Sequence, residues 1–457
     1  MKLNLHPNAA ISFNCKAEAL LDKFVIINKN TILAKKHTFE PDHFISSTIT
    51  EKEIIGDIIV SSTDLVGNEI GRFFDHEGNR IGLSGENYHN LLKLSENMQR
   101  TKQLSPFVSV SFLKDTIFNW MKDKYLSATY VSMTDFVINK CEQELTDLEI
   151  WIPIAETFIQ SDLQIGKVIL KTISKEVLDK WMDHWGEETD KKEEMKKGFM
   201  IRYQKKLQGH PAATIKLIAE PNRAFEIAVE ESEKALSILR IFGFPVVVHP
   251  GLNSYTTLLG KEHLDGYTYF LVNNEKLLLI TEGLTDKSGI ALALSSDFIS
   301  MIKPRGLDVL SEILAEGPKT KFQEQVLDSL FIYSRSPLAK DVADKLIYIL
   351  VAMESILLKD ENEPIQQNIS KRMAYLIGNT VEQRKDIIAN IIKIYKLRSS
   401  FIHHGQRIED METLLIFMKN AWIFFHILIK KINKFKDKQD LIDKIENAFL
   451  SGSSAII

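Results

Sequence analysis

VEQRKDIIANIIKIYKLRSS, residues 381–400, is predicted to form one helix that ends before the break at His403-His404-Gly405. The sequence from Lys321 onward has almost no β pattern, and Pro337, Pro364 and Gly378-Asn379 divide it into segments. Further helices are predicted at 320–334, 338–359, 365–377, 410–434 and 437–450. Because the connections are short, we expect an antiparallel helical bundle.

The chain that precedes this bundle has a mixed pattern. Short β-prone runs and turn signals dominate its opening section, and a hairpin is predicted at 267–280 with Asn273-Asn274 in the turn. At 457 residues the chain is too long for one compact core. We expect an α+β protein with three parts: a mixed α/β N-terminal region at 1–220, interpreted as a sensor, an α/β continuation or second subdomain at 221–318, and a helical domain at 319–457.

The composition excludes several classes of protein. Hydrophobic residues make up 44% of the chain and charged residues 26%, which is typical of a soluble globular protein. The formal net charge is -4, so no basic field covers the surface and any RNA contact must be local. Only Cys15 and Cys141 are present, far apart in the sequence, so we expect neither a disulfide framework nor a thiolate zinc site.

Neither end of the chain carries a clear membrane signal. The first 20 residues lack the charged and apolar regions of a secretory signal. The most apolar stretch, residues 414–432, is interrupted by Lys419, Asn420, His426, Lys430 and Lys431. We therefore expect a buried or interfacial helix there, no membrane span, and a cytoplasmic location.

Common catalytic motifs are missing from the sequence. It has no G-x-x-x-x-G-K-[ST], G-x-G-x-x-G, H-E-x-x-H or G-x-S-x-G motif, so NTPase, dinucleotide-binding, zincin and esterase functions lose support. What remains is Arg398 and His403, separated by four residues near a helix end, with His404 directly after them.

Arginine and histidine together suit RNA cleavage without a metal or other cofactor. The reaction needs a base for the 2′-hydroxyl, an acid for the leaving 5′-oxygen and a fixed cation for the phosphate charge. Histidine titrates near neutral pH, and guanidinium holds phosphate oxygens in a bidentate way. Two copies of the pair would supply all three groups.

The spacing alone is weak evidence for such a site. On an ideal helix His403 lies about 140° around the axis from Arg398, so the two converge best if the helix ends between them. With 12 His in the chain, about one Arg-His pair with four to six intervening residues is expected by chance. The surrounding sequence must therefore decide, and a basic helix end that caps its carbonyls is the alternative.

The segment Tyr395-Lys396-Leu397-Arg398-Ser399-Ser400-Phe401-Ile402-His403-His404-Gly405 resembles the Y-x-L-R-S-x-I-V-H-G signature of Apea-like HEPN domains. Two further segments resemble the same family. Residues 350–357, LVAMESIL, are similar to its A-L-E-S-L helix, and residues 369–374, ISKRMA, are similar to its basic segment. The resemblance covers residues 322–435, about a quarter of the chain.

The resemblance implies a helical bundle that dimerises so that two R-x4-6-H motifs form an endoribonuclease site, often in prokaryotic defence or toxin systems. It implies Arg398 and His403 as the catalytic pair and Ser399 as a polar neighbour. The doubled histidine leaves open whether His403 or His404 points into the site. His403 is favoured because Phe401-Ile402 then matches the apolar pair of the signature.

Three more residues are candidates for supporting roles. Glu354 lies in an apolar segment, so we expect it to form a salt bridge across the bundle, or more specifically to orient Arg398. Lys371 and Arg372 are weak candidates for contacts to RNA phosphates, since exposed basic residues often only keep a helix soluble.

The resemblance implies a metal-independent endoribonuclease that acts as a homodimer on RNA. By analogy with the family, we hypothesise that the large N-terminal region holds it inactive until a phage-derived trigger or partner binds. The alternative is a non-catalytic HEPN-like module that dimerises or binds nucleic acid. A ligand-binding enzyme in the N-terminal region is a third, weaker interpretation for which no motif is present.

Overall fold

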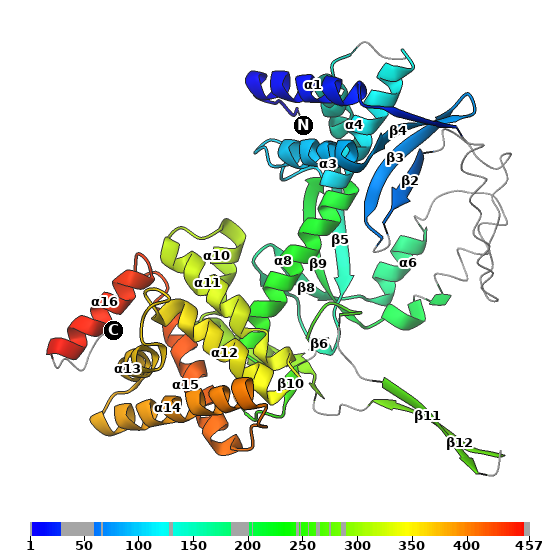
Figure 1. Ribbon diagram of the computed structural model, residues 1–457. Helices are drawn as coiled ribbons and strands as arrows, with labels where there is room; N and C mark the ends of the chain where they lie inside the picture. The colour runs from blue at the N-terminus through cyan, green and yellow to red at the C-terminus, as the bar shows by residue number, and fades with distance from the viewer. Residues whose placement is uncertain are drawn as a thin grey trace. The chain divides into compact units, whose positions relative to one another are not determined.

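The computed structural model of the protein (Figure 1) describes residues 2–28, 59–64, 67–127, 131–183, 201–202, 204–243, 246, 248–254, 256–261, 266–273, 276–284 and 289–451. Two compact units make up the chain: unit 1 comprises residues 1–149 and 216–227, and unit 2 comprises residues 150–215 and 228–457. The prediction of an α+β protein is confirmed.

Unit 1 is an antiparallel sheet packed with helices. The sheet has the order β1-β4-β3-β2, and its strands are β1 (Val25–Asn28), β2 (Ile59–Thr63), β3 (Glu69–His76) and β4 (Asn79–Ser84). The helices are α1 (Pro7–Leu21), α3 (Gly85–Gln99), α4 (Val110–Tyr125) and α5 (Met133–Glu144). One hydrophobic core joins all four helices to the inner face of the sheet.

The turn between β3 and β4 fixes the register of this sheet. Glu77 and Gly78 both have positive φ, 47° and 75°, between the paired residues His76 and Asn79. Two-residue hairpin turns of this kind match the right-handed twist of the flanking strands. The sequence Asp75 to Arg80 therefore forms the turn that its composition predicts.

A charged cluster lies between the sheet and the helices of unit 1. Glu69 accepts hydrogen bonds from Lys114, Ser61 and Tyr88, and it forms an ion pair with Arg72. Burial by itself would raise the pKa of Glu69, but these hydrogen bonds outweigh burial and lower the pKa to about 2. The folded state therefore favours the ionised carboxylate.

Unit 1 is expected to lose stability in acid because of Glu69. Its folded pKa of about 2 lies below the ordinary value of about 4.3, so its contribution is complete above that value and is lost as the pH falls toward 2. Urea denaturation between pH 5 and pH 2.5 will show a smaller acid-induced loss in Glu69→Gln than in the wild type. Glu86→Gln, at an exposed position in α3, is the control and should follow the wild type.

Unit 2 begins with a four-stranded sheet in the order β5-β9-β8-β7, in which β8 is antiparallel to both β7 and β9. The strands of unit 2 are β5 (Thr146–Pro153), β6 (Thr157–Ile159), β7 (Leu163–Ile165), β8 (Val168–Thr172), β9 (Pro211–Ala219), β10 (Asn253–Ser254), β13 (Gly289–Ile290) and β14 (Leu292–Leu294). β6 pairs in parallel with β14, and β10 pairs in parallel with β13. The helices α6 (Lys175–Asp183), α8 (Pro221–Ile241), α9 (Ser296–Ile302) and α10 (Leu307–Glu316) complete this section. β5, β9 and α8 each contain residues of both units.

The predicted hairpin is confirmed as β11 (Gly266–Asn273) and β12 (Lys276–Leu284), which pair antiparallel. Asn273 is paired with Lys276 in the ladder, so the prediction that Asn273 lies in the turn is wrong. Asn274, the second predicted turn residue, lies outside the described residues.

The C-terminal part of unit 2 is the predicted helical bundle. Its helices are α11 (Lys321–Tyr333), α12 (Val342–Leu357), α13 (Ile365–Ile377), α14 (Val381–His404), α15 (Met411–Lys430) and α16 (Lys438–Ser451). All six predicted helices are present. Capping boxes at Thr320 and Thr380 start α11 and α14, because each threonine and the glutamine three residues later satisfy each other's free backbone N–H groups.

Helix α15 packs against α11, α12, α13 and α14. Among the described helices, it alone is long and apolar enough by length and composition to cross a membrane. Ten of its 20 residues are buried, including Phe417, Phe424 and Phe425. Its buried apolar residues therefore belong to the bundle core.

A single hydrophobic core extends through unit 2, from the sheet residue Ile154 to Ile445 in α16. This core includes residues on both sides of position 318, such as Leu310 in α10 and Phe322 in α11. The compact units divide the chain after residues 149, 215 and 227, and position 318 lies inside unit 2. Helices from the predicted parts 221–318 and 319–457 share this core with the sheet. The sequence pattern does not reveal this packing.

Candidate functional site

Arg398 lies in the last third of α14 with its side chain half-buried. Its Nε atom is buried and makes no hydrogen bond within the described part of the chain. No carboxylate of the described residues forms an ion pair with the guanidinium. A buried donor of a charged group without a partner costs about 1–3 kcal/mol or more, so this position carries a stability cost that the fold does not offset locally.

His403 and His404 are the last two residues of α14, and both are exposed. Gly405 follows in the left-handed conformation, with φ 62°, and donates its N–H to the carbonyl of Phe401 at 2.9 Å. Gln406 N–H bonds to the carbonyl of Ser400 at 3.3 Å. These two hydrogen bonds satisfy the carbonyls of Ser400 and Phe401 in the last turn of the helix. The helix ends at Gly405, which adopts the left-handed conformation without steric cost because it has no Cβ.

The prediction that α14 ends between Arg398 and His403 is wrong. The helix continues to His404, because Phe401 packs against the core of unit 2 and the next glycine is Gly405. On a continuous helix the five-residue step places His403 about 140° from Arg398. One chain therefore does not bring the two side chains to the same face.

Glu354 in α12 accepts a hydrogen bond from the hydroxyl of Tyr395 at 2.8 Å. The predicted salt bridge to a lysine or arginine is wrong for the described residues, because the partner of this half-buried carboxylate is a phenol. Burial raises the pKa of Tyr395 above its usual range, Glu354 raises it further, and the nearby charge of Arg398 lowers it. Glu354 therefore binds the Tyr395 hydroxyl, and it forms no hydrogen bond or ion pair with Arg398 within the described residues.

Tyr395 was not among the predicted functional residues. It lies three residues before Arg398 on α14, a spacing that places two side chains on neighbouring positions of a helix surface. The sequence does carry a signal for the hydrogen bond between Tyr395 and Glu354. It is a tyrosine three residues before Arg398 together with a glutamate in an apolar helix.

Replacing Tyr395 by phenylalanine is expected to lower the free energy of unfolding by about 2 kcal/mol, since hydrogen bonds to charged groups contribute about 1.5–3 kcal/mol. The substitution removes the donor that Glu354 uses and leaves the ring in place. Urea denaturation measures the loss. Tyr375→Phe is the control, because the Tyr375 hydroxyl makes no hydrogen bond among the described residues, and a similar loss there would contradict the prediction.

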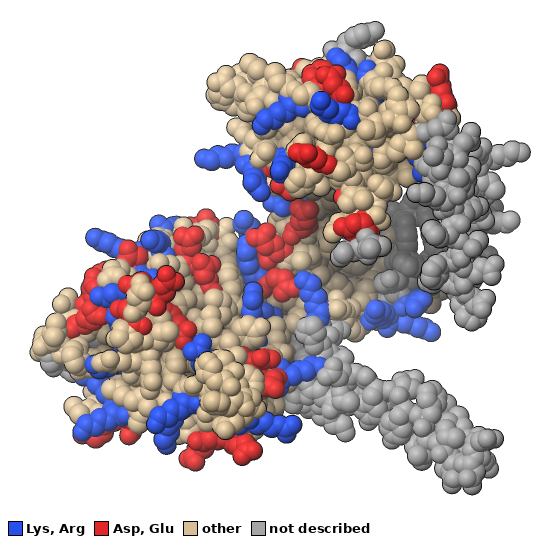
Figure 2. All heavy atoms as spheres, viewed as in Figure 1, with Lys and Arg blue, Asp and Glu red and all other residues tan. Residues whose placement is uncertain are grey.

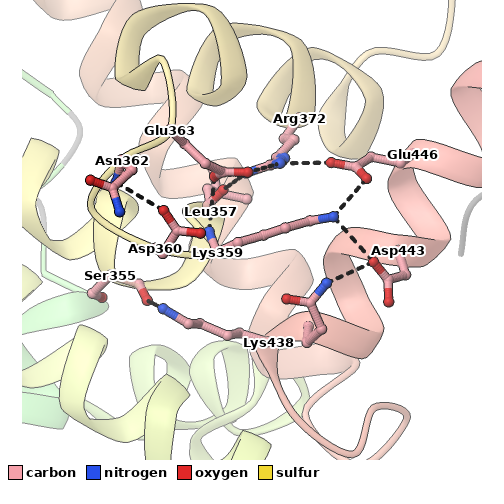
Figure 3. A network of polar contacts seen from close by, with 11 residues as sticks. Ser355, Leu357, Lys359, Asp360, Asn362, Glu363, Arg372, Lys438, Asp443 and Glu446 are labelled. Atoms are coloured by element: carbon pink, nitrogen blue, oxygen red, sulfur yellow. Dashed lines mark hydrogen bonds and ion pairs between the residues drawn. The ribbon is translucent and has the colours of Figure 1, made fainter.

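Arg372 is buried inside the protein and is not available to contact RNA. It is 4% exposed and forms two hydrogen bonds of 2.7 Å with Glu363, one of 2.6 Å with Glu446 and one of 2.6 Å with the carbonyl of Leu357 (Figure 3). The weak prediction for Arg372 is therefore corrected: its donors are engaged inside the protein, between the α12–α13 connection and α16. Lys371 beside it is exposed, with its ammonium 6.0 Å from the centre of the Phe449 ring.

The surroundings of the histidines are open but not strongly basic. Ser399 is exposed next to Arg398, as the resemblance implies for a polar neighbour. Figure 2 shows Lys and Arg side chains interspersed with Asp and Glu over the helical elements on the face drawn, so no single sign of charge covers it. Among the described residues, no group of three or more His, Cys, Asp or Glu is arranged to hold a metal ion.

The resemblance to HEPN domains rests on three sequence segments, residues 350–357, 369–374 and 395–405. No family model, curated protein or solved structure matches this chain. The functional interpretation therefore depends on the geometry around Arg398 and on experiment.

Proposed function

We propose that the helical part of unit 2 is a metal-independent endoribonuclease that works as a homodimer, with Arg398 and His403 as its catalytic pair. The observation that carries this proposal is the unpaired, half-buried guanidinium of Arg398 beside an exposed pair of histidines at a helix end. An arginine without an internal partner retains its donors for a ligand, and phosphate is the ligand that its planar fork fits best.

The proposed reaction is transesterification of RNA. The 2′-oxygen attacks the adjacent phosphorus while a histidine takes the hydroxyl proton, and the bond from phosphorus to the 5′-oxygen breaks. A second histidine protonates the leaving 5′-oxygen, and Arg398 stabilises the negative charge on the phosphate oxygens. The products are a 2′,3′-cyclic phosphate and a 5′-hydroxyl.

A second protomer is needed because one chain does not hold Arg398 and His403 on the same face of α14. In a symmetric dimer the His403 of the partner chain can approach the Arg398 of the first, and the two histidines then serve as base and acid. His404 remains the alternative base, since it is exposed one residue further along.

Regulation belongs to the same proposal. Unchecked RNA cleavage harms the cell, so the N-terminal region is proposed to keep the nuclease inactive in the cytoplasm until a phage-derived trigger or partner binds. Cleavage of cellular RNA by the isolated full-length protein, without any addition, would refute this autoinhibition.

The experiment that tests the nuclease is incubation of the full-length protein with total RNA and tRNA in EDTA, in buffer and in extract of phage-infected cells. Cyclic phosphate ends in either condition support the nuclease, and such ends in buffer alone refute its autoinhibition. Intact RNA in both conditions contradicts it.

A non-catalytic dimerisation or nucleic-acid-binding module is the second candidate function. Ile402 at the end of α14 and Ile416 and Ile423 in α15 favour it, because these large apolar side chains are between 40% and 49% exposed. The last two are seven residues apart and therefore share one face of α15. This candidate predicts RNA binding or self-association without any covalent product.

A further inference from the structure

The helices α1 and α3 of unit 1 pack against each other (Figure 1). Their side chains line a groove of about 410 Å³. From α1 it is lined by Lys16, Ala19 and Leu20, and Lys16 lies three and four residues before the other two. These spacings place the three residues on one side of the helix. Lys23, in the turn that follows α1, completes this wall of the groove.

The opposite wall is a face of α3 with an unusual composition. It consists of Asn87, Asn90, Leu94 and Asn97, at steps of three, four and three residues, with Lys93 beside them. Asparagine is a poorer helix former than alanine or lysine, by up to about 0.7 kcal/mol per residue, because its amide competes for backbone hydrogen bonds. Three asparagines on one face of α3 therefore lower the stability of this helix, and packing within unit 1 does not account for their presence there.

The polar groups of this groove are not used within the protein. In the described part of unit 1, neither the three asparagine amides nor the ammonium groups of Lys16, Lys23 and Lys93 form a hydrogen bond or an ion pair. No carboxylate lines the groove. Of the acidic residues on these helices, Glu18 pairs with Lys124 and Glu96 pairs with Arg100.

Apolar side chains complete the lining. Leu20 and Leu94 belong to the hydrophobic core of unit 1, and Ala19 lies beside them. The groove thus offers three cations, three amides that can donate and accept, and an apolar surface. Pockets of about 300–1000 Å³ with a few convergent polar groups on an apolar lining are typical of small-molecule sites.

We propose that the groove between α1 and α3 binds a small phosphorylated ligand with a flat ring, of the size of a nucleoside monophosphate. The lysines neutralise the phosphate, the asparagine amides bond to heteroatoms on the edge of the ring, and the alanine and leucines contact its face. This site is separate from the Arg398 segment and does not depend on RNA cleavage.

Isothermal titration calorimetry of the full-length protein tests the proposal, with adenosine 5′-monophosphate, adenosine and inorganic phosphate as probes. We expect the monophosphate to bind at least tenfold more tightly than either of the other two, because only it uses both the cations and the amides. Lys93→Glu is expected to weaken its binding at least tenfold, and Asn90→Ala to weaken it by a smaller factor.

Lys140→Glu is the matched control, because Lys140 is an exposed lysine of unit 1 in α5 that does not line the groove. Its affinity should equal that of the wild type within twofold. Lys93→Gln repeats the test with a neutral side chain if the glutamate variant melts at a lower temperature. No binding of the monophosphate, equal binding of inorganic phosphate, or unchanged affinity in both Lys93 variants would each overturn the proposal.

Discussion

Replacing Arg398 by alanine is expected to lower the rate of RNA cleavage by about 100-fold to 1000-fold, which is the usual effect of removing one fixed donor from a transition state. The reason lies in the geometry of the side chain. The guanidinium makes no hydrogen bond or ion pair with the described residues and its Nε is buried, so its donors remain free for phosphate oxygens. The measurement is the initial rate of formation of cyclic phosphate ends from a defined RNA.

Two variants distinguish catalysis from a general effect of charge. Arg398→Lys keeps the charge but loses the bidentate fork, so its rate should remain well below that of the wild type. Lys396→Ala removes an exposed cation two residues away on the same helix, and its rate should change less than twofold. Equal losses in Arg398→Ala and Lys396→Ala would refute a specific role for Arg398.

Single substitutions will show whether His403 or His404 is the catalytic histidine. His403→Ala is expected to lower the rate by about the same factor as Arg398→Ala, since general acid-base groups contribute about 100-fold to 10,000-fold. His404→Ala should retain most of the activity. The opposite result would assign the catalytic role to His404, and full activity of both variants would exclude both histidines.

Mixing two inactive variants tests whether the site is shared between chains. A heterodimer of Arg398→Ala and His403→Ala contains one intact arginine and one intact histidine on different protomers. Because α14 turns these residues away from each other within one chain, we expect the mixture to recover part of the activity. No recovery after demonstrated subunit exchange would mean that each chain uses its own pair.

The second large effect is expected at Arg372, where methionine should lower the free energy of unfolding by about 3 kcal/mol or more. The guanidinium holds Glu363 with two hydrogen bonds, and these lower the pKa of Glu363 to about 2. Removing the arginine leaves that carboxylate, whose side chain is 15% exposed, with the backbone N–H of Lys359 but without its charged donor. It also removes the side-chain donor to the carbonyl of Leu357. Urea denaturation followed by circular dichroism measures the loss.

Neighbouring substitutions show that the effect depends on burial. Lys371→Met changes the adjacent exposed residue and should cost less than about 0.5 kcal/mol. Glu446→Gln removes the other carboxylate, but its side chain is 42% exposed, so solvent screens the pair and we expect a loss below about 1 kcal/mol. A loss in Arg372→Met no larger than in Lys371→Met would contradict the prediction.

The sequence predicted the local structure of the C-terminal part closely. Helix boundaries there are set by residues next to one another, such as the capping threonines Thr320 and Thr380 and the prolines before α12 and α13. The hairpin β11-β12 followed in the same way from two β-prone runs. The end of α14 was placed one turn too early, because Phe401 gains from packing against a core that the local pattern does not contain.

Long-range contacts decided what local pattern did not. Arg372 and Lys371 are adjacent basic residues in the sequence, yet only Arg372 faces Glu363 and Glu446 and is buried. Similarly, the sequence marked Glu354 as a carboxylate in an apolar helix, but only the packing of α12 against α14 made Tyr395 its partner.

By itself, the sequence determined the α+β class, the six C-terminal helices and the presence of Arg398 near a histidine pair, because each depends on neighbouring residues and helical spacing. The tertiary structure alone decided which charges are buried, that one core joins the sheet of unit 2 to its helices, and that α1 and α3 enclose a groove. Those features arise where segments far apart in the chain bury apolar surface against each other. The free energy of this burial depends on residues in several segments, so no single segment shows it as a periodic pattern.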